Sequence, residues 1–392
     1  MKQGWEIKKL GDIAKFYRGL TYSKGDEVPS STNMVLRSNN VDLETNALVY
    51  DDMKCLREDL LVDEDKKVKA NSILICMSNG SKQHIGKVAY IQDDIDYAFG
   101  GFMGLIVPTK DIEGKYLYYS CVSHHFKHFL AGIGNGIGIT NLRFSDLSSY
   151  CFPVPTIAEQ EKIVAELDCL SGIIEKKKQQ LKELDNLAQS IFYEMFGDPV
   201  ENDKGWDVKK FGDVANSELG KMLDSKKNQG ELYPYLCSAN VQWNDVDCTQ
   251  VKEMRFEEDE LERYRVYKGD LLICEGGDTG RCAIWKSDNA IYYQNALHRV
   301  RFVDGLMLPI FCLYTMKCYK ERGEIDKYSS GQTIKHLVKK ALLTIPLIVP
   351  PITLQQEFAS KIEAIEKQKE LIAQSIKETE TLFNSRMDYY FN

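Results

Sequence analysis

Apolar residues recur at alternating steps of four and three through a long segment in the middle of the chain. The ten positions, one of which is a lysine, are Ile163, Leu167, Leu170, Ile174, Lys177, Leu181, Leu184, Ala188, Ile191 and Met195. A mean period of 3.5 residues is what a helix needs to pack lengthwise against a second helix. Pro155 precedes the segment and Gly197-Asp198-Pro199 follows it. The pattern therefore predicts one long helix that ends near the glycine, because proline cannot continue a helix.

The C-terminal segment repeats this pattern in the same phase. Its positions are Phe358, Ile362, Ile365, Lys369, Ile372, Ile376, Thr379, Phe383, Arg386 and Tyr390. The lead-in Pro155-Thr-Ile-Ala-Glu-Gln160 also matches Pro350-Pro-Ile-Thr-Leu-Gln355, at a shift of 195 residues (355 − 160). Either segment alone would be an ordinary amphipathic surface helix. Two copies in one phase predict that the helices pack against each other.

A globular block precedes each helix, and the two blocks also repeat. Gly4-Trp-Glu-Ile-Lys-Lys-Leu-Gly-Asp-Ile-Ala14 returns as Gly205-Trp-Asp-Val-Lys-Lys-Phe-Gly-Asp-Val-Ala215 at a shift of 201 residues (205 − 4). Asn71–Cys76 is echoed by Gly269–Cys274 at a shift of 198 residues (269 − 71). The chain therefore divides into a block at 1–155, a helix at 156–200, a block at 201–350 and a helix at 351–392.

Inside the blocks, short apolar runs bounded by turns predict buried strands. The runs are 73–77, 87–91 and 103–107 in the first block, and 271–274 and 283–286 in the second. Segments 115–130 and 308–321 show helical spacing instead. The predicted fold class is α+β, with two similar globular α/β domains, two long helices and an internal pseudo-twofold repeat.

Composition narrows the functional classes. The 392 residues contain 43% hydrophobic residues, but no apolar stretch approaches the roughly 18 residues of a membrane span. The N-terminal residues lack an apolar signal region, so no export and no membrane is implied. Eleven cysteines without a Cys-x-x-Cys pair predict reduced thiols in a cytoplasmic protein.

The charge of the chain gives no support for a nucleic-acid ligand by itself. The net charge is −8, of which the helical segments 156–200 and 351–392 carry −4 and −2, and each block carries −1. A nucleic-acid ligand would therefore require basic residues gathered on one face of a block.

Signatures of catalysis are missing from the sequence. It has no Gly-x4-Gly-Lys-Ser/Thr phosphate loop and no Asn/Asp-Pro-Pro-aromatic run of amino-methyltransferases. Glu64-Asp-Lys66 lies in a charged loop, which favours a solvated turn over a nuclease site. The trio His124, His125 and His128 has no counterpart in the second block. We therefore expect no catalytic residue and no metal site.

Polar and basic side chains do recur in turns of both blocks. Examples are the turn at 82–87, Arg281 after a glycine-rich turn, the pair His298-Arg299, and the segment 329–336. Asn, Gln, Arg, Lys and His are the side chains that bind base edges and phosphates in DNA grooves. For any single residue a solvated loop is the simpler interpretation, but the repetition favours a binding role for the group.

The ordered set of motifs resembles a known family. Both blocks open with Gly-Trp-x-x-Lys-Lys-Leu/Phe-Gly-Asp-Ile/Val-Ala and close on Pro-x-Ile-x-x-Gln before a long helix. This plan is similar to the DNA-specificity subunit of bacterial and archaeal type I restriction–modification systems. The run 192–199 after the first helix resembles the central spacer of that family, and the resemblance covers essentially the whole chain.

The resemblance implies two target recognition domains, 1–155 and 201–350, held apart by two helices packed antiparallel as a spacer. Each domain would bind one half of a split, asymmetric site in double-stranded DNA. The helices would dock two methyltransferase subunits, with restriction/translocase subunits joining them. S-adenosylmethionine, ATP and magnesium would bind to those partners, so no cofactor is expected in this chain.

The resemblance also places the DNA contacts in the recurring turns. The candidates in the first domain are Arg37, Asn39, Asn40, Lys82, Gln83, His84, Lys87, Asn135, Thr140, Asn141 and Arg143. Those in the second domain are Ser238, Asn240, Gln242, Arg281, His298, Arg299, Gln332, Thr333, Lys335 and His336.

Helix length is compatible with a spacer. The series from Ile163 to Met195 spans 32 steps (195 − 163), or about 48 Å at roughly 1.5 Å per residue, and one turn of duplex DNA is about 34 Å. Two alternatives stay open at this point. One is a structural adaptor that assembles proteins through the helix pair without binding DNA, and the other is a stand-alone nuclease or methylase.

Overall fold

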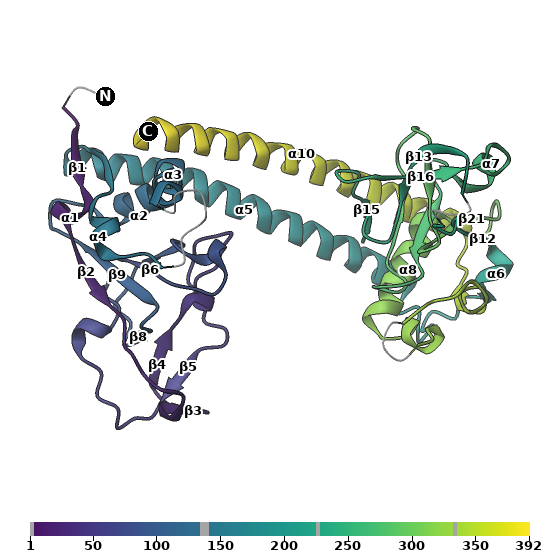
Figure 1. The fold of residues 1–392 in the computed structure, drawn as a ribbon. Coiled ribbons are helices and arrows are strands. Elements are labelled where there is room, and N and C mark those ends of the chain that lie inside the picture. Colours follow the sequence, from purple (N-terminus) through teal and green to yellow (C-terminus); the bar gives the residue numbers. More distant parts are fainter. Residues whose placement is uncertain (1–3, 134–140, 225–227, 332–334) are drawn as a thin grey trace. The chain divides into compact units, whose positions relative to one another are not determined.

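The computed structural model describes residues 4–133, 141–224, 228–331 and 335–392. These residues form two compact units: unit 1 comprises 1–178 and 374–392, and unit 2 comprises 179–373. Both predicted long helices are present, as α5 (Ile157–Phe196) and α10 (Ile352–Phe391), each of 40 residues. Each unit therefore contains one globular block and a part of each long helix (Figure 1).

Unit 1 contains two four-stranded sheets. The first has the order β2-β9-β6-β7 and is antiparallel throughout, with bounds Ala14–Arg18, Met103–Pro108, Ser72–Cys76 and Val88–Ile91. The second has the order β3-β5-β4-β8, with bounds Glu27–Val28, Lys54–Leu56, Asn33–Leu36 and Ala98–Phe99. Helices α2 (Gly114–Val122) and α3 (His124–Ile133) contribute to the same core as the first sheet.

Unit 2 repeats this plan. Its first sheet has the order β12-β21-β18-β19, with bounds Ala215–Leu219, Leu297–Phe302, Leu271–Cys274 and Cys282–Ile284. Its second sheet has the order β16-β13-β20-β17, with bounds Lys252–Phe256, Glu231–Leu236, Ile291–Tyr293 and Arg265–Val266. A small hairpin, β14 (Val241–Gln242) and β15 (Asp245–Val246), and helices α7 (Leu261–Tyr264) and α8 (Pro309–Glu321) complete it.

The repeated opening motif pairs with the strand before each long helix. In unit 1, β1 (Glu6–Lys9) pairs with β10 (Cys151–Val154), and in unit 2, β11 (Val208–Lys210) pairs with β22 (Pro346–Ile348). Short helices follow the opening strands, α1 (Leu10–Ile13) and α6 (Phe211–Val214), and others precede the closing strands, α4 (Phe144–Ser148) and α9 (Lys339–Leu342). The opening motif thus forms one strand of the pair that closes each block.

Short 3-10 turns occupy several loops of both units. Their bounds are Lys24–Asp26, Ser38–Asn40, Glu64–Lys66 and Lys82–His84 in unit 1, and Glu258–Glu260 and Ile325–Tyr328 in unit 2. The Glu64–Lys66 turn is stabilised by surface ion pairs, including Lys66 with Asp65 at 3.1 Å.

The long helices pack antiparallel within each unit. In unit 1, the Arg386 guanidinium donates to the Glu166 carboxylate, whereas Lys177 Nζ donates to Thr379 Oγ1 at 3.2 Å. In unit 2, Lys369 Nζ donates to Asp185 Oδ1 at 2.7 Å. In unit 1 the α5 residue rises from 166 to 177 while its α10 partner falls from 386 to 379. In unit 2 it rises from 185 to 192 while its partner falls from 369 to 358, as antiparallel packing requires.

The apolar positions predicted at steps of four and three along the two helices, which we call the helix seam, face inward, but their burial is uneven. Ile163, Leu167, Phe358 and Ile362 are buried among side chains of the globular blocks. Other apolar positions of the helix seam are only half-buried: Leu170, Ile174, Leu181, Leu184, Ile191, Met195, Ile372 and Phe383.

Two elements differ from the sequence-based expectation. Near the end of α5 the fully buried residues are Phe192 and Phe196, because the globular block of unit 2 packs on the helix beside the seam. The expected single helix over 115–130 is two helices, interrupted at Ser123, whose hydroxyl donates to Ser120 O. The predicted stop of α5 is confirmed, since Gly197 has a φ of +75°.

Candidate nucleic-acid interface

In unit 1 the predicted turns gather at one end of the first sheet. Because the strands are antiparallel, three strand ends lie on the same side of the sheet: the end of β2 at Arg18, the end of β6 at Cys76 and the start of β9 at Met103. Asn79 Nδ2 donates to Ser38 Oγ at 2.7 Å, which ties the 38–40 turn to the turn after β6. Residues 141–143 join them because the Leu142 amide donates to Met77 O at 2.7 Å. We call this edge the recognition end of unit 1.

Unit 2 builds the same edge with the same backbone contacts. The Leu337 amide donates to Glu275 O at 2.7 Å, as Leu142 does to Met77. The Glu275 amide donates to Ala296 O at 2.9 Å, as Met77 does to Phe102 O. The Arg281 guanidinium donates to Ser238 O at 2.9 Å and so holds the turn that matches residues 38–40. This edge is the recognition end of unit 2.

The structure corrects the assignment of Asn40 and Asn240 to DNA. Both side chains are buried, and they make matching hydrogen bonds. Asn40 Oδ1 accepts from the Arg37 amide, while its Nδ2 donates to Val49 O and Asp51 O. Asn240 Oδ1 accepts from the Cys237 amide, while its Nδ2 donates to Asp247 O and Gln250 O. Each asparagine thus fixes the shape of a turn and is not available to a ligand.

Three basic candidates are corrected for the same reason. Lys87 is buried and donates to Val41 O at 2.6 Å, and its desolvation lowers the pKa of the amine. His298 is fully buried with Nε2 at 2.8 Å from Leu337 O, and burial lowers its pKa too. Arg299 is buried and donates to the carbonyls of Arg263 and Arg265 at 2.8 and 2.6 Å.

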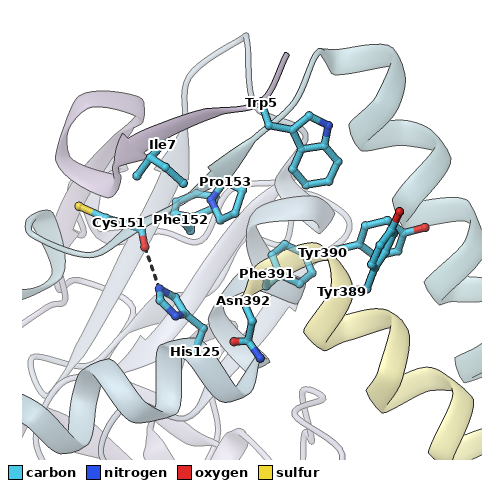
Figure 2. A pocket seen from close by; sticks show the side chains of 10 residues that line it. All are labelled: Trp5, Ile7, His125, Cys151, Phe152, Pro153, Tyr389, Tyr390, Phe391 and Asn392. Atoms are coloured by element: carbon cyan, nitrogen blue, oxygen red, sulfur yellow. Dashed lines mark hydrogen bonds between the residues drawn. The ribbon is translucent and has the colours of Figure 1, made fainter. Parts of the chain in front are cut away.

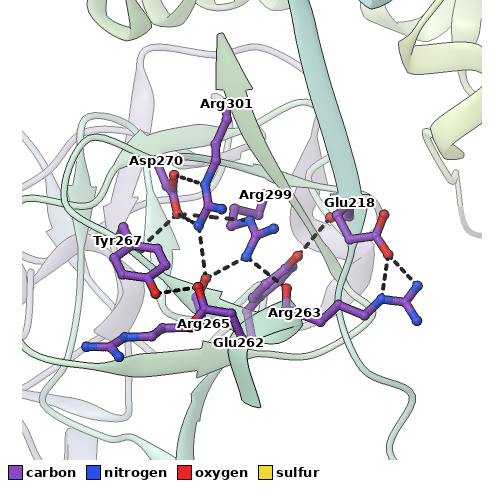
Figure 3. A network of polar contacts seen from close by, with 9 residues as sticks. Glu218, Glu262, Arg263, Arg265, Tyr267, Asp270, Arg299 and Arg301 are labelled. Atoms are coloured by element: carbon purple, nitrogen blue, oxygen red, sulfur yellow. Dashed lines mark hydrogen bonds and ion pairs between the residues drawn. The ribbon is translucent and has the colours of Figure 1, made fainter. Parts of the chain in front are cut away.

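Arg299 belongs to a polar network on the sheet of unit 2 (Figure 3). Arg301 forms two hydrogen bonds with the carboxylate of Asp270, at 2.7 and 2.9 Å. Asp270 also accepts from the Tyr267 amide at 2.8 Å. Arg299 and Arg301 both donate to Arg265 O, so the network joins the two sheets of unit 2, and we interpret it as structural.

The remaining candidates stay predictions, and the structure places them in two groups. Some lie on the surface with protein partners: Arg37 and Asn39 donate to Asp52, Gln242 donates to Ala239 O, and Lys335 donates to Asp326. Arg281 likewise donates to Ser238 O. The other candidates that are accessible to solvent at the recognition ends, whatever their partners, are Lys82, Gln83, His84, Asn141, Arg143, Ser238 and His336. Asn135, Thr140, Gln332 and Thr333 lie outside the described residues.

Two residues at the recognition end of unit 1 were missed by the sequence analysis. Arg18 ends β2 and is exposed, and Phe102 has 71% of its surface exposed in the turn before β9. An exposed aromatic residue inside the run Phe99-Gly-Gly-Phe102 was the available signal for the second. Neither residue has a counterpart of its own type in unit 2, so the repeat between the two halves does not reveal them.

The histidine trio also has an ordinary structural explanation. His125 Nε2 lies 3.0 Å from Cys151 O, and His124 Nδ1 lies 3.2 Å from Asp388 Oδ1. His125 borders a cleft of about 320 Å³ whose other walls include Trp5, Phe152 and Tyr390 (Figure 2). The described residues that line this cleft include neither lysine nor arginine, so these side chains offer no cation to a phosphate.

In the described part of the chain, no three His, Cys, Asp or Glu side chains lie close enough together to hold a metal ion. Within the same residues, none of the helices combines the length and the apolar character needed to span a bilayer.

A family model and the similar known proteins all point to the same family. A family model described as type I restriction modification DNA specificity domain matches residues 2–186 and again 203–381. The EcoKI specificity subunit of Escherichia coli K12 is 23% identical, over 93% of this chain and 82% of its own length. The StySPI specificity subunit of Salmonella potsdam is 21% identical, over 98% of this chain and 87% of its own length.

Solved structures show the same fold. The type I restriction–modification S subunit from M. genitalium has a TM-score of 0.56 and 14% identity, over 100% of this chain and 98% of its own. A chain from a structural study of the assembly and conformational transition of the type I R-M system has a TM-score of 0.63 and 17% identity, over 99% and 97%.

Proposed function

This chain belongs to the type I restriction modification DNA specificity family, and we propose that each of its two units binds one half of a bipartite, asymmetric DNA site. The family match in two copies confirms the predicted duplication. It also makes sequence-specific DNA recognition the function of the chain and does not favour the adaptor that assembles proteins without DNA.

The observation that carries this proposal is the comparison of the two recognition ends. Backbone hydrogen bonds place five side-chain positions alike in the two units. The residues of unit 1 and unit 2 at these positions are Arg18 and Leu219, Met77 and Glu275, Phe102 and Ala296, Asn141 and His336, and Arg143 and Val338. Met77 is buried, but the other four side chains of unit 1 are exposed. One scaffold therefore presents two different sets of donors, acceptors and apolar groups, which supports two different half-sites.

We propose that the helix pair sets the spacing of the half-sites. Each helix has 40 residues, about 60 Å at roughly 1.5 Å per residue. Two weak half-site interactions on one stiff linker reinforce each other through effective concentration.

We further propose that two methyltransferase subunits dock on the helices. Leu187 in unit 2 and Leu382 in unit 1 occupy the same position of the repeat (382 − 187 = 195). Both are exposed, at 47% and 50%. Exposed leucines at equivalent places of a duplicated helix support two equivalent contacts with apolar partner surfaces. Restriction/translocase subunits would join the same complex.

In this proposal the chain itself is not catalytic. The methyltransferase would bind S-adenosylmethionine, and the restriction subunit would bind ATP and magnesium. Eleven free cysteines suit the reducing cytoplasm, where the chain would meet cellular DNA.

The direct test is a footprint of the chain in complex with its methyltransferase partner on a DNA fragment that carries the target. We expect two short protected base-specific tracts separated by a gap of unspecified sequence. A single continuous recognition tract would contradict the proposal. Incubation of the isolated chain with DNA, magnesium and S-adenosylmethionine should give neither cleavage nor methylation.

A further inference from the structure

A pocket of about 380 Å³ opens at the recognition end of unit 1. Its polar lining comes from Arg18, Asn141, Arg143 and Ser78, and its apolar lining includes Phe102 and Phe144. Among the described residues that line it there is neither an aspartate nor a glutamate, so the two guanidinium groups make the pocket electropositive. The pocket combines two bidentate donors, an amide and an exposed aromatic ring.

The two arginines of this pocket differ from the other arginines of the protein. In the described part of the chain, nearly every arginine donates to a carboxylate or a carbonyl. The exceptions are Arg18, Arg143 and Arg265, and the guanidinium of Arg265 instead lies over the Tyr267 ring at 4.9 Å. Two arginines without an acceptor thus line one pocket, where a ligand can supply the acceptors.

The backbone around the pocket is held firmly, although the arginine side chains are not. A Cβ on Gly19 would meet Gly100 O at 2.1 Å, so the chain after Arg18 passes directly against the loop before Phe102. The Arg143 amide donates to Asp146 Oδ2 at 2.9 Å, which fixes the start of α4. The pocket is therefore built into the fold and does not depend on a ligand for its walls.

We propose that this pocket binds the major-groove edge of guanine in the half-site recognised by unit 1. A guanidinium group offers paired donors that match the O6 and N7 acceptors of guanine. The ring of Phe102 supplies an apolar contact at the mouth, where a thymine methyl group or a neighbouring base would lie. This inference rests on the proposed function and names the base that one recognition end selects.

Unit 2 lacks this chemistry at the same positions. Leu219 and Val338 replace the arginines, and Ala296 replaces Phe102. The guanine preference therefore belongs to only one half of the site, so the other half serves as an internal control.

The test uses the full chain in its complex with the methyltransferase and selects bound sequences from random duplex DNA. We expect a guanine in the half-site of unit 1 that the parental complex selects by about tenfold to a hundredfold. Arg18→Ala and Arg143→Ala should each weaken selection of guanine in this half-site and leave the other half-site unchanged. Arg57→Ala is the matched control, because Arg57 is a surface arginine of unit 1 that pairs with Asp26 and Asp59.

Lysine variants separate base recognition from phosphate binding. Arg143→Lys keeps the charge but loses the paired donors, so guanine selection should fall as it does in Arg143→Ala. If lysine restores binding, or if alanine weakens all sequences equally with a smaller salt dependence, the arginines bind phosphate and the inference is wrong. Unchanged selection in both alanine variants would also overturn it. A parental complex that selects no sequence at all would instead refute the proposed function.

Discussion

At the scale of single residues, a polar side chain in a turn can either hold the turn or face solvent. Asn40 and Asn240 hold their turns from inside, whereas Asn141 lies on the surface. The sequence predicted all three as DNA contacts because it showed the turns but not the direction of each side chain. A repeated asparagine at the end of a turn is the pattern expected of a structural residue, since both copies then meet the same need.

The same limit explains the missed residues. Arg18 and Phe102 are far apart in sequence and come together only when β2 and β9 pair. Repeated turns mark what the two halves share, whereas residues that distinguish two half-sites must differ between the halves. Repetition therefore revealed the scaffold and concealed the side chains that vary on it.

Burial of His298 predicts a pH effect on unit 2. Desolvation lowers its pKa from 6.5, so the folded state holds the neutral ring. Stability is thus complete above the unfolded pKa and falls as the pH drops through 6.5 toward the lower folded value, because only the unfolded chain then binds the proton. Urea unfolding followed by tryptophan fluorescence should show a loss of stability from pH 7.5 to 5.5.

His298→Gln keeps a donor for Leu337 O and removes this titration, so its pH dependence over the same range should be weaker. Three of the four tryptophans, at 206, 243 and 285, lie in unit 2, so the signal reports mainly on that unit. An equal loss in both proteins would show that other groups cause the effect.

At the scale of elements, the long helices followed from periodicity alone. A period of 3.5 residues predicted which face of each helix packs against the other, and the order of proline and glycine predicted where the helix begins and ends. The sequence also showed the two lysines in the helix seam, and the amines of both donate hydrogen bonds. Lys177 donates to Ser375 and Thr379, and Lys369 donates to Asp185. Burial of Phe192 and Phe196 could not be predicted, because it depends on a globular block that packs beside the seam.

Charge in the seam should separate the helices. Leu170→Asp in unit 1 or Leu181→Asp in unit 2 would bring an unpaired carboxylate between them, and each should cost about 2–4 kcal/mol of unfolding free energy. Chemical denaturation of the purified variants measures this cost. The matched control is Leu382→Asp at an exposed helix position, which should change stability by less than about 0.5 kcal/mol. Equal stability in all three variants would mean that the seam assignment is wrong.

At the scale of the whole molecule, duplication was the strongest signal in the sequence, and one residue shows why it is so visible. Gln160 is fully buried, and its amide accepts from the Glu113 amide and donates to Asp111 O and Pro155 O. Gln355 makes the same three bonds with Leu308, Leu306 and Pro350. Each glutamine ties the start of a long helix to its own globular block.

These glutamines predict two separable unfolding events, since each unit has a large hydrophobic cluster of its own. Gln160→Leu should destabilise unit 1 and Gln355→Leu unit 2, each by roughly 2–4 kcal/mol, because three buried backbone groups lose their partner. Differential scanning calorimetry should show a different transition lowered in each variant. Gln374→Leu, at an exposed helix position, is the control. If both buried variants lower one common transition, the units unfold together and this account of their independence is wrong.

The matching backbone bonds at the two recognition ends have an evolutionary consequence. Because Phe102 and Ala296 accept the same main-chain hydrogen bond with unrelated side chains, we expect that side chains at such exposed positions can change while the turn keeps its backbone contacts. Under the proposed function, point mutations at a few exposed positions would change the DNA sequence by which a host distinguishes its own genome from foreign DNA. Under that function, methylation and cleavage would acquire the new target together, because both partners would take it from this chain.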